Sequence, residues 1–319
     1  MTAARPEAGL EVTWREVVVD GALLRVMEAG PADPSQPGEV LLFLHGWGLS
    51  PRAYADGVTR LTAAGVRVIA PCLPGFGGSD GPALGSIDLS AYARSVGRLL
   101  DVLGVDRPVF VAGHSFGGGV ALQLATEQPQ RVRSLTLVNS IGGAPGRRQG
   151  LVDASWVRWA AGALTELSPR ELLRAAPGLL RDVVPNALRQ PVRMAMSARL
   201  ALTVSLADEA AALVAAGVPV LFVWGDADRL VLPGELAGVE GVLPAEVVRG
   251  GRHGWLLTQP EEFATLLRNA LVVHAMLERK KRGQALVLPR GSTLADLIPA
   301  ERRAAARVPR QRRSSGARR

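Results

Sequence analysis

The spacing of hydrophobic residues along the first third of the chain predicts strands of two kinds. Residues 11–19 and 22–27 alternate apolar and polar side chains on either side of Asp20-Gly21, a pattern typical of two antiparallel strands joined by a hairpin turn. Residues 40–44 form a continuous apolar run, which is typical of a strand covered on both faces of a sheet. The Pro/Gly/Ser-rich residues 30–38 between them are expected to form a loop.

From residue 51 onward, predicted helices alternate with predicted strands. Helices are expected at 51–64, 89–103, 117–127, 207–216 and 260–279, and strands at 66–70, 108–112, 134–138, 219–224 and 246–249. Strands that alternate with helices form a parallel sheet covered by helices on both faces. The sequence therefore predicts an α/β fold with a doubly wound, mostly parallel sheet.

The alternation stops between residues 143 and 206. This segment combines helical patches with five prolines, two tryptophans and many arginines. Because the strand pattern resumes after it, we expect a helical cap inserted on top of the sheet. The predicted organisation is a core of residues 10–142 and 207–278, a cap of 143–206 and a basic tail of 279–319.

Length and composition agree with one large core. The chain has 319 residues, of which 48% are hydrophobic, and it contains no apolar run long enough to span a membrane. Residues 1–9 lack the apolar segment of a secretory signal. Cys72 is the only cysteine, so no intrachain disulfide can form. These features predict a cytoplasmic protein.

The basic character of the chain is concentrated in the predicted tail. Residues 279–319 hold 13 Lys and Arg residues and two acids, a net charge of +11, whereas the whole chain carries +8. The body is therefore mildly acidic, and its ligand cannot be inferred from the overall charge. The tail is low in bulky residues, which favours disorder. Contact of the tail with an anionic membrane surface or with nucleic acid is the alternative.

The segment most informative about chemistry is Gly113-His-Ser-Phe-Gly117, between the predicted strand 108–112 and the helix that follows. A G-x-S-x-G sequence in this context is typical of a nucleophile elbow. The turn forces Ser115 into a strained backbone conformation, and glycine avoids collisions two positions on either side. The first N–H groups of the next helix are suited to a developing oxyanion.

A serine hydroxyl needs a base to remove its proton and a third group to orient that base. His253 follows the last predicted strand, so it lies at the carboxyl edge of the sheet together with Ser115. Asp226 and Asp228 follow the strand 219–224 at the same edge, and both are candidate acids. The chain order Ser, Asp, His matches the order expected for this architecture.

Taken together, these motifs give the chain a resemblance to the α/β-hydrolase-fold superfamily, in its capped branch of esterases, epoxide hydrolases, haloalkane dehalogenases and carbon–carbon bond hydrolases. The resemblance covers roughly residues 10–278. It is carried by His45-Gly-Trp-Gly48, Pro74-Gly-Phe-Gly-Gly-Ser79, Gly113-His-Ser-Phe-Gly117, Gly225-Asp-Ala-Asp228 with Pro233, and His253 before Gln259-Pro-Glu-Glu-Phe263.

The resemblance assigns roles to particular residues. It implies that Asp228, the last residue of the G-x-x-D pattern, is the triad acid, with Asp226 as the minor alternative. It also implies that the backbone N–H groups of Trp47 and Phe116 form the oxyanion hole. Neither a metal ion nor an organic cofactor is expected. Serine at position 115, where related dehalogenases and epoxide hydrolases carry aspartate, favours acyl transfer.

The predicted function is a serine hydrolase that cleaves a carboxylic ester or thioester of a small, largely apolar substrate through an acyl-enzyme. A carbon–carbon bond hydrolase and an acyltransferase are alternatives on the same triad. Related carbon–carbon bond hydrolases often carry asparagine and tryptophan where this chain has His114 and Gly254. A non-catalytic binding protein on the same scaffold is the alternative from another class.

Several other residues have two interpretations. Trp156 and Trp159 lie on one helical face and are expected either to pack the cap on the core or to line an acyl pocket. The same choice applies to Trp255. The other three histidines, His45, His114 and His274, are expected to have structural roles, and Cys72 to be a small buried residue.

Overall fold

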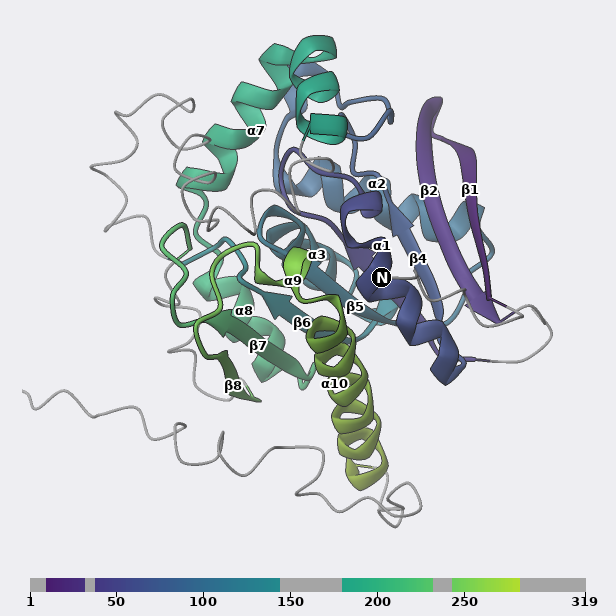
Figure 1. Ribbon diagram of the computed structural model, residues 1–319, viewed down its shortest axis with the longest axis vertical. Coiled ribbons are helices and arrows are strands. Elements are labelled where there is room, and N and C mark those ends of the chain that lie inside the picture. The colour runs from purple at the N-terminus through teal and green to yellow at the C-terminus, as the bar shows by residue number, and fades with distance from the viewer. Residues whose placement is uncertain (1–9, 32–37, 144–179, 232–242, 282–319) are drawn as a thin grey trace, which may run out of the picture.

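The computed structural model describes residues 10–31, 38–143, 180–231 and 243–281, and the structural statements below concern these residues (Figure 1). Within them a sheet of eight strands has the order β1-β2-β4-β3-β5-β6-β7-β8. The two pairings that involve β2 are antiparallel, and the other five are parallel. The predicted mostly parallel α/β sheet is confirmed. The strands are β1 (Leu10–Val19), β2 (Ala22–Pro31), β3 (Val40–Leu44), β4 (Arg67–Pro71), β5 (Val109–His114), β6 (Val132–Val138), β7 (Val220–Gly225) and β8 (Leu243–Val248).

Helices cover both faces of this sheet, as Figure 1 shows. One face packs against α2, α3 and α8, and the other against α1, α9 and α10. Every residue of β3 and β5 is buried, which explains their continuous apolar sequences. The helices are α1 (Ala55–Val58), α2 (Leu89–Val102), α3 (Phe116–Glu127), α7 (Pro191–Thr203), α8 (Ala207–Ala215), α9 (Trp255–Thr258) and α10 (Pro260–Lys281).

The expected single helix at residues 51–64 is wrong in detail. A 3₁₀ turn, η1 (Pro51–Tyr54), leads into the short α1, which continues as a second 3₁₀ segment, η2 (Thr59–Ala64). The hydroxyls of Thr59 and Thr62 donate to the carbonyls of Ala55 and Thr59, so they compete with helical hydrogen bonding. Gly57 lies against Phe263, where a Cβ would approach the ring to 2.7 Å.

The described part of the expected cap consists of helical residues 180–189 and α7. Trp156 and Trp159 lie outside the described residues, as does the tail from residue 282. Helix α10 runs two residues beyond its predicted end, to Lys281. None of the described helices has the length and apolarity needed to span a bilayer.

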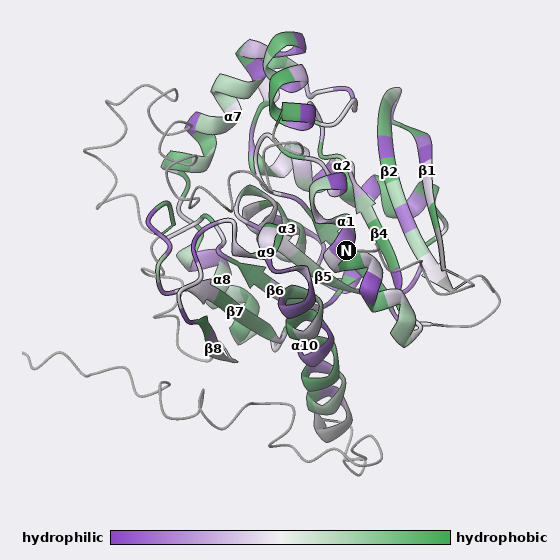
Figure 2. Cartoon of the chain, viewed as in Figure 1, coloured by the Kyte–Doolittle hydropathy of each residue, from purple (hydrophilic) through white to green (hydrophobic). Residues whose placement is uncertain are grey.

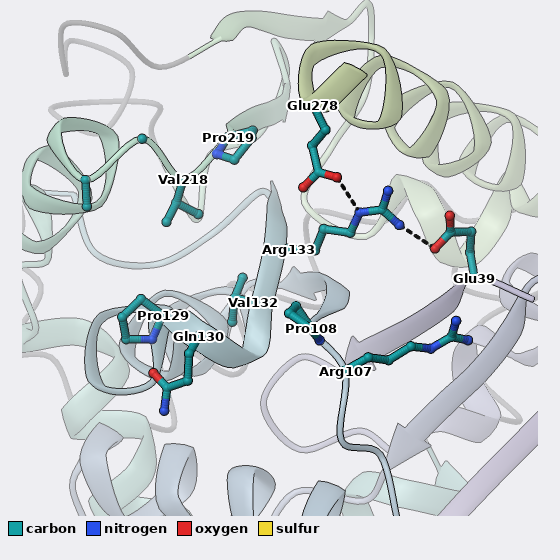
Figure 3. Close-up of a pocket in the computed structure, with 12 residues that line it drawn as sticks. Glu39, Arg107, Pro108, Pro129, Gln130, Val132, Arg133, Val218, Pro219 and Glu278 are labelled. Carbon is teal, nitrogen blue, oxygen red and sulfur yellow. Dashed lines mark hydrogen bonds and ion pairs between the residues drawn. The ribbon is translucent and has the colours of Figure 1, made fainter. Parts of the chain in front are cut away.

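A pocket of about 540 Å³ opens at the amino ends of β5, β6 and β7, and Arg133 is its central charged residue (Figure 3). Arg133 donates to Glu39 at 2.6 Å and to Glu278 at 2.8 Å, and its guanidinium lies 4.7 Å from the ring centroid of Phe110. The two carboxylates compensate the charge of Arg133. The pocket lies at the opposite edge of the sheet from Ser115, so it takes no part in the chemistry considered below.

His274, on α10, is buried against Phe110, with the ring centroids 6.5 Å apart. Neither ring nitrogen has a hydrogen-bond partner among the described residues. Burial, with a smaller contribution from the positive charge of Arg133, lowers the pKa of His274 to about 4. The imidazole is therefore neutral in the folded chain, in keeping with the expected structural role.

This neutral histidine destabilises the fold in acid. The unfolded chain takes up a proton at His274 below its ordinary pKa of about 6.5, whereas the folded chain does so only near 4. The free energy of unfolding therefore falls between these two pH values. Between pH 7 and pH 5 the free energy of unfolding of the wild-type chain should therefore decrease by up to about 2 kcal/mol more than that of His274→Leu, since one pKa unit corresponds to about 1.4 kcal/mol. Urea unfolding of the wild-type chain and of the variant at the two pH values measures this difference. An equal decrease in the two proteins would contradict the role of His274.

Candidate active site

Ser115 occupies a sharp turn between β5 and α3. Its φ of 52° and ψ of −115° are rare for a residue with a side chain. The flanking glycines are required by close approach: a Cβ on Gly113 would lie 2.3 Å from the carbonyl oxygen of Gly117, and one on Gly117 would lie 2.3 Å from that of Leu44. The crowding fixes the direction in which the Ser115 hydroxyl leaves the sheet.

His253 lies within hydrogen-bond distance of both its predicted partners. Its Nε2 is 2.9 Å from Ser115 Oγ, and its Nδ1 is 2.9 Å from Asp228 Oδ2. Because a carboxylate only accepts, Nδ1 carries the proton in neutral His253 and Nε2 accepts from the serine hydroxyl. All three side chains are buried. This is the geometry in which an imidazole acts as general base toward a serine.

Of the two candidate acids, Asp228 is the one that faces His253. Its second carboxylate oxygen, Oδ1, accepts from the N–H groups of Leu230 and Val231, both at 2.8 Å. Asp226 is exposed and instead accepts from the N–H of Gly250. The carboxylate of Asp228 is therefore fixed by its own loop and holds the imidazole in one orientation.

The backbone of His253, like its ring, is fixed by hydrogen bonds. The Nδ2 of Asn139 donates to the carbonyls of Arg252 at 3.2 Å and of His253 at 3.1 Å, while its Oδ1 accepts from the N–H of Gly225 at 3.1 Å. Asn139 follows β6, and Gly225 ends β7. One buried amide therefore ties the loop of the candidate base to the strand that precedes the candidate acid.

His114, directly before Ser115, forms the second contact with the carbonyl of His253. Its Nε2 lies 3.0 Å from that carbonyl, so Nε2 must donate and Nδ1 must accept. Tyr54 Oη lies 2.8 Å from this Nδ1 and 3.0 Å from the N–H of Gly46, so the hydroxyl donates to the ring and accepts from Gly46. The network joins the loop after β3 to the backbone of His253.

The network requires His114 to be neutral, and its surroundings favour that form. Burial is the main cause that lowers the pKa of His114 well below 6.5, and the neighbouring imidazole of His253 lowers it further. The two rings lie with their centroids 5.0 Å apart. His114 therefore positions its neighbours and is not a second base, as expected from the sequence.

The loop after β3 carries Trp47 and is braced by His45. The Nε2 of His45 accepts from the N–H of Leu73 and its Nδ1 donates to the carbonyl of Gly46, each at 2.8 Å. Burial lowers the pKa of His45 to about 4, so the ring stays neutral. Phe116 is the first residue of α3, where an N–H group has no acceptor within the helix.

Residues of the cap hold the same loop from the other side. The N–H and hydroxyl of Ser50 donate to Asp182 at 2.9 and 2.7 Å, and burial raises the pKa of this carboxyl. Asn186 donates to the carbonyl of Gly48 and accepts from the N–H of Gly77, both at 3.0 Å. The loop that carries Trp47 is therefore fixed by the core and by the cap together.

The indole of Trp47 reaches α7 of the cap. Its Nε1 donates to Ser197 Oγ at 3.0 Å and lies 3.3 Å from the carbonyl of Met194. The Trp47 side chain is thereby fixed to the cap, so its backbone N–H is held in a defined loop.

Of the two roles considered for Trp255, the structure favours core packing over substrate binding. Its side chain is 1% exposed and packs in the core beneath α10, edge-to-face with Phe263 at 6.1 Å. Cys72 is buried, as expected, and burial raises the pKa of its thiol to about 12. Gly77 packs so closely on Cys72 that a Cβ would lie 2.4 Å from the sulfur. Both side chains therefore have packing roles in the described structure.

Four residues of the site have no motif in the sequence: Tyr54, Asn139, Asp182 and Asn186. Asn139 carries one signal, because it is a polar residue directly after a buried strand at the carboxyl edge of the sheet. The others become recognisable only when segments 60 to 138 residues apart are brought together. These residues orient backbone groups around the three side chains that the motifs identify.

The comparison with protein families agrees with this geometry. Residues 41–266 match the model of the alpha/beta hydrolase family. The chain belongs to this family. It is therefore an α/β-fold hydrolase, and the family resemblance expected from the sequence is confirmed.

Two relatives illustrate the range of the family. A dihydrolipoyllysine-residue acetyltransferase component of an acetoin cleaving system, from Cupriavidus necator, is 31% identical over 267 residues, which cover 79% of this chain and 67% of the relative. A 2-hydroxymuconate semialdehyde hydrolase from a Pseudomonas species is 35% identical over 153 residues, 47% of this chain. That match spans only half of the relative's length.

Solved structures show the same fold at lower identity. A thermophilic esterase from Thermogutta terrifontis superposes with a TM-score of 0.64 at 21% identity, covering 82% of this chain and 99% of the esterase. An enol-lactonase from Burkholderia xenovorans gives 0.65 at 18% identity, covering 81% and 99% of the two chains.

Tyr54→Phe tests the positioning network directly. The change leaves the Gly46 N–H and His114 Nδ1 without their buried partner, at a cost of about 1–3 kcal/mol per unpaired group. We expect the rate at which a fluorophosphonate labels Ser115 to fall about tenfold, because the His253 backbone loses part of its support. An unchanged labelling rate, in a variant shown by urea unfolding to be folded, would contradict the role of this network.

Proposed function

We propose that the chain is a serine hydrolase that cleaves an ester-type bond, a carboxylic ester or a thioester, in a small and largely apolar substrate. The observation that carries this proposal is the continuous pair of hydrogen bonds from Ser115 Oγ through His253 to Asp228. In this arrangement a hydroxyl can give up its proton as it attacks a carbonyl carbon.

The proposed first step forms an acyl-enzyme. His253 Nε2 takes the proton of Ser115 as Oγ bonds to the carbonyl carbon, and the carbonyl electron pair moves onto oxygen. The N–H groups of Phe116 and Trp47 stabilise that oxyanion; losing one such donor costs about 100- to 1,000-fold in turnover. The intermediate then expels the alcohol or thiol, which takes the proton from His253.

The second step releases the acid. His253 removes a proton from water, and the resulting nucleophile attacks the acyl carbon. Collapse of the second intermediate breaks the bond to Ser115 Oγ and returns the proton from His253 to the serine. Asp228 stays ionised throughout and stabilises the imidazolium form of His253.

The preference for an apolar substrate is supported by the surroundings of the loop that carries Trp47. A Cβ on Gly48 would lie 3.5 Å from a methyl group of Val183 and 3.7 Å from that of Met194. Both residues come from the cap helices. Apolar side chains therefore flank the loop from which one oxyanion donor is expected, as in many small-molecule pockets.

Acyl transfer to an acceptor other than water is a second candidate. It is favoured by the 31% identity to an acetyltransferase component over most of this chain. The first step is the same, and only the nucleophile of the second step differs. A carbon–carbon bond hydrolase is a further alternative, supported by the partial match to a 2-hydroxymuconate semialdehyde hydrolase. We expect the enzyme to act in the cytoplasm, in keeping with its single cysteine.

Substrates of graded chemistry separate these candidates. We expect p-nitrophenyl esters and a matching thioester to be turned over, with a burst of nitrophenol, and an epoxide and a vinylogous diketone to remain intact. Cleavage of the diketone without turnover of any ester would contradict the ester proposal. Product analysis with water, an alcohol and an amine distinguishes hydrolysis from transfer.

Ser115→Ala is expected to lower kcat on the best ester about 10⁶-fold, because base and nucleophile act as a unit. It should also abolish labelling by a fluorophosphonate. Ser134, a serine buried in β6, provides the matched control, and Ser134→Ala should keep both activity and labelling. Labelling that persists in the Ser115 variant would rule out Ser115 as the nucleophile.

A further inference from the structure

The outer surface of the described cap helices has an unusual composition. Nine residues between positions 180 and 200 are exposed, six of them apolar and three of them arginine. The described residues contain nine exposed large hydrophobic side chains, and five of these lie here. We call this surface the cap face: Leu180, Val184, Leu188, Pro191, Val192 and Met196, with Arg181, Arg189 and Arg199.

The spacing places these apolar side chains on one side of each helix. Leu180, Val184 and Leu188 are four residues apart, as are Val192 and Met196 on α7. The opposite side of the helices is occupied by the residues that bond to the core, such as Asp182 and Ser197. Figure 2 shows hydrophobic residues along α7, at the outer end of the molecule.

All charged side chains of the cap face are positive. Residues 180–203 contain one acid, Asp182, and it is buried and accepts two hydrogen bonds from Ser50. The arginines of the cap face are therefore accompanied by no exposed acid from these helices. An exposed apolar surface bearing only cations is unlike the mixed-charge surface of most soluble domains.

We propose that the cap face docks the chain onto an anionic lipid surface. Apolar side chains of this size enter the boundary between headgroups and acyl chains, and arginine pairs with lipid phosphates. A second copy of the chain fits less well, because a two-fold contact would bring the same arginines against one another. The proposal does not depend on ester chemistry, since binding can be measured without a substrate.

A matched pair of variants tests the proposal. Val192 on α7 and Val102 at the end of α2 are both 55% exposed, but only Val192 belongs to the cap face. The full chain is sedimented with vesicles of phosphatidylcholine alone or mixed in equal parts with phosphatidylglycerol. We expect binding to the anionic vesicles only, with Val192→Glu lowering the partition coefficient about tenfold and Val102→Glu leaving it unchanged.

Other outcomes overturn the proposal. Wild-type and Val192→Glu chains that bind equally would assign any lipid contact to another segment, such as the basic tail. Binding to neutral vesicles as strong as binding to anionic ones would show that pairing of the arginines with anionic lipid does not contribute. A chain that binds no vesicles, but forms a dimer that Val192→Glu dissociates, would identify the cap face as an interface between copies.

Discussion

The strained backbone of Ser115 is the constraint on which the rest of the site depends. A non-glycine residue at this φ and ψ costs about 1–3 kcal/mol and persists only where its surroundings enforce it. Here the Ser115 N–H donates to the carbonyl of Val138 at 3.0 Å, and its carbonyl accepts from Gly118 and Ile141 at 3.0 and 3.2 Å. Hydrogen bonds from α3 and from β6 with the residues after it thus stabilise the strained backbone conformation of Ser115. In this conformation the hydroxyl points toward His253.

His253 is held in its turn by groups from three strand ends. Its ring is bound by Asp228 after β7, and its carbonyl by Asn139 after β6 and His114 at the end of β5. Parallel strands bring these segments to one edge of the sheet, so residues more than a hundred positions apart meet without a long-range motif. The cap adds a further set of contacts through Asp182 and Asn186. The cap therefore also holds the loop of Trp47.

The sequence was sufficient to predict the fold, and the three side chains that it singled out, Ser115, His253 and Asp228, are brought within hydrogen-bond distance by that fold. Periodicity located the strands, because burial on both faces of a parallel sheet demands continuous apolar runs such as Val40–Leu44. Glycine spacing identified Ser115, because close packing forbids a Cβ on either side. Residues 51–64 were mispredicted as one helix, since the packing of Gly57 on Phe263 and the threonine hydroxyls are not visible in a hydrophobic pattern. Tyr54 and Asp182 could not be predicted either, because each acts through a partner that only the folded chain supplies.

In the proposed mechanism, turnover passes through a covalent bond between the substrate acyl group and Ser115. Rapid acid quench during turnover of a p-nitrophenyl ester, followed by mass spectrometry of the peptide that contains residues 109–119, tests it most directly. We expect this peptide to gain the mass of the acyl group at Ser115 and to lose it once the substrate is exhausted. Steady turnover with no adduct on this peptide, or an adduct on another residue, would rule out Ser115 as the residue that carries the acyl group.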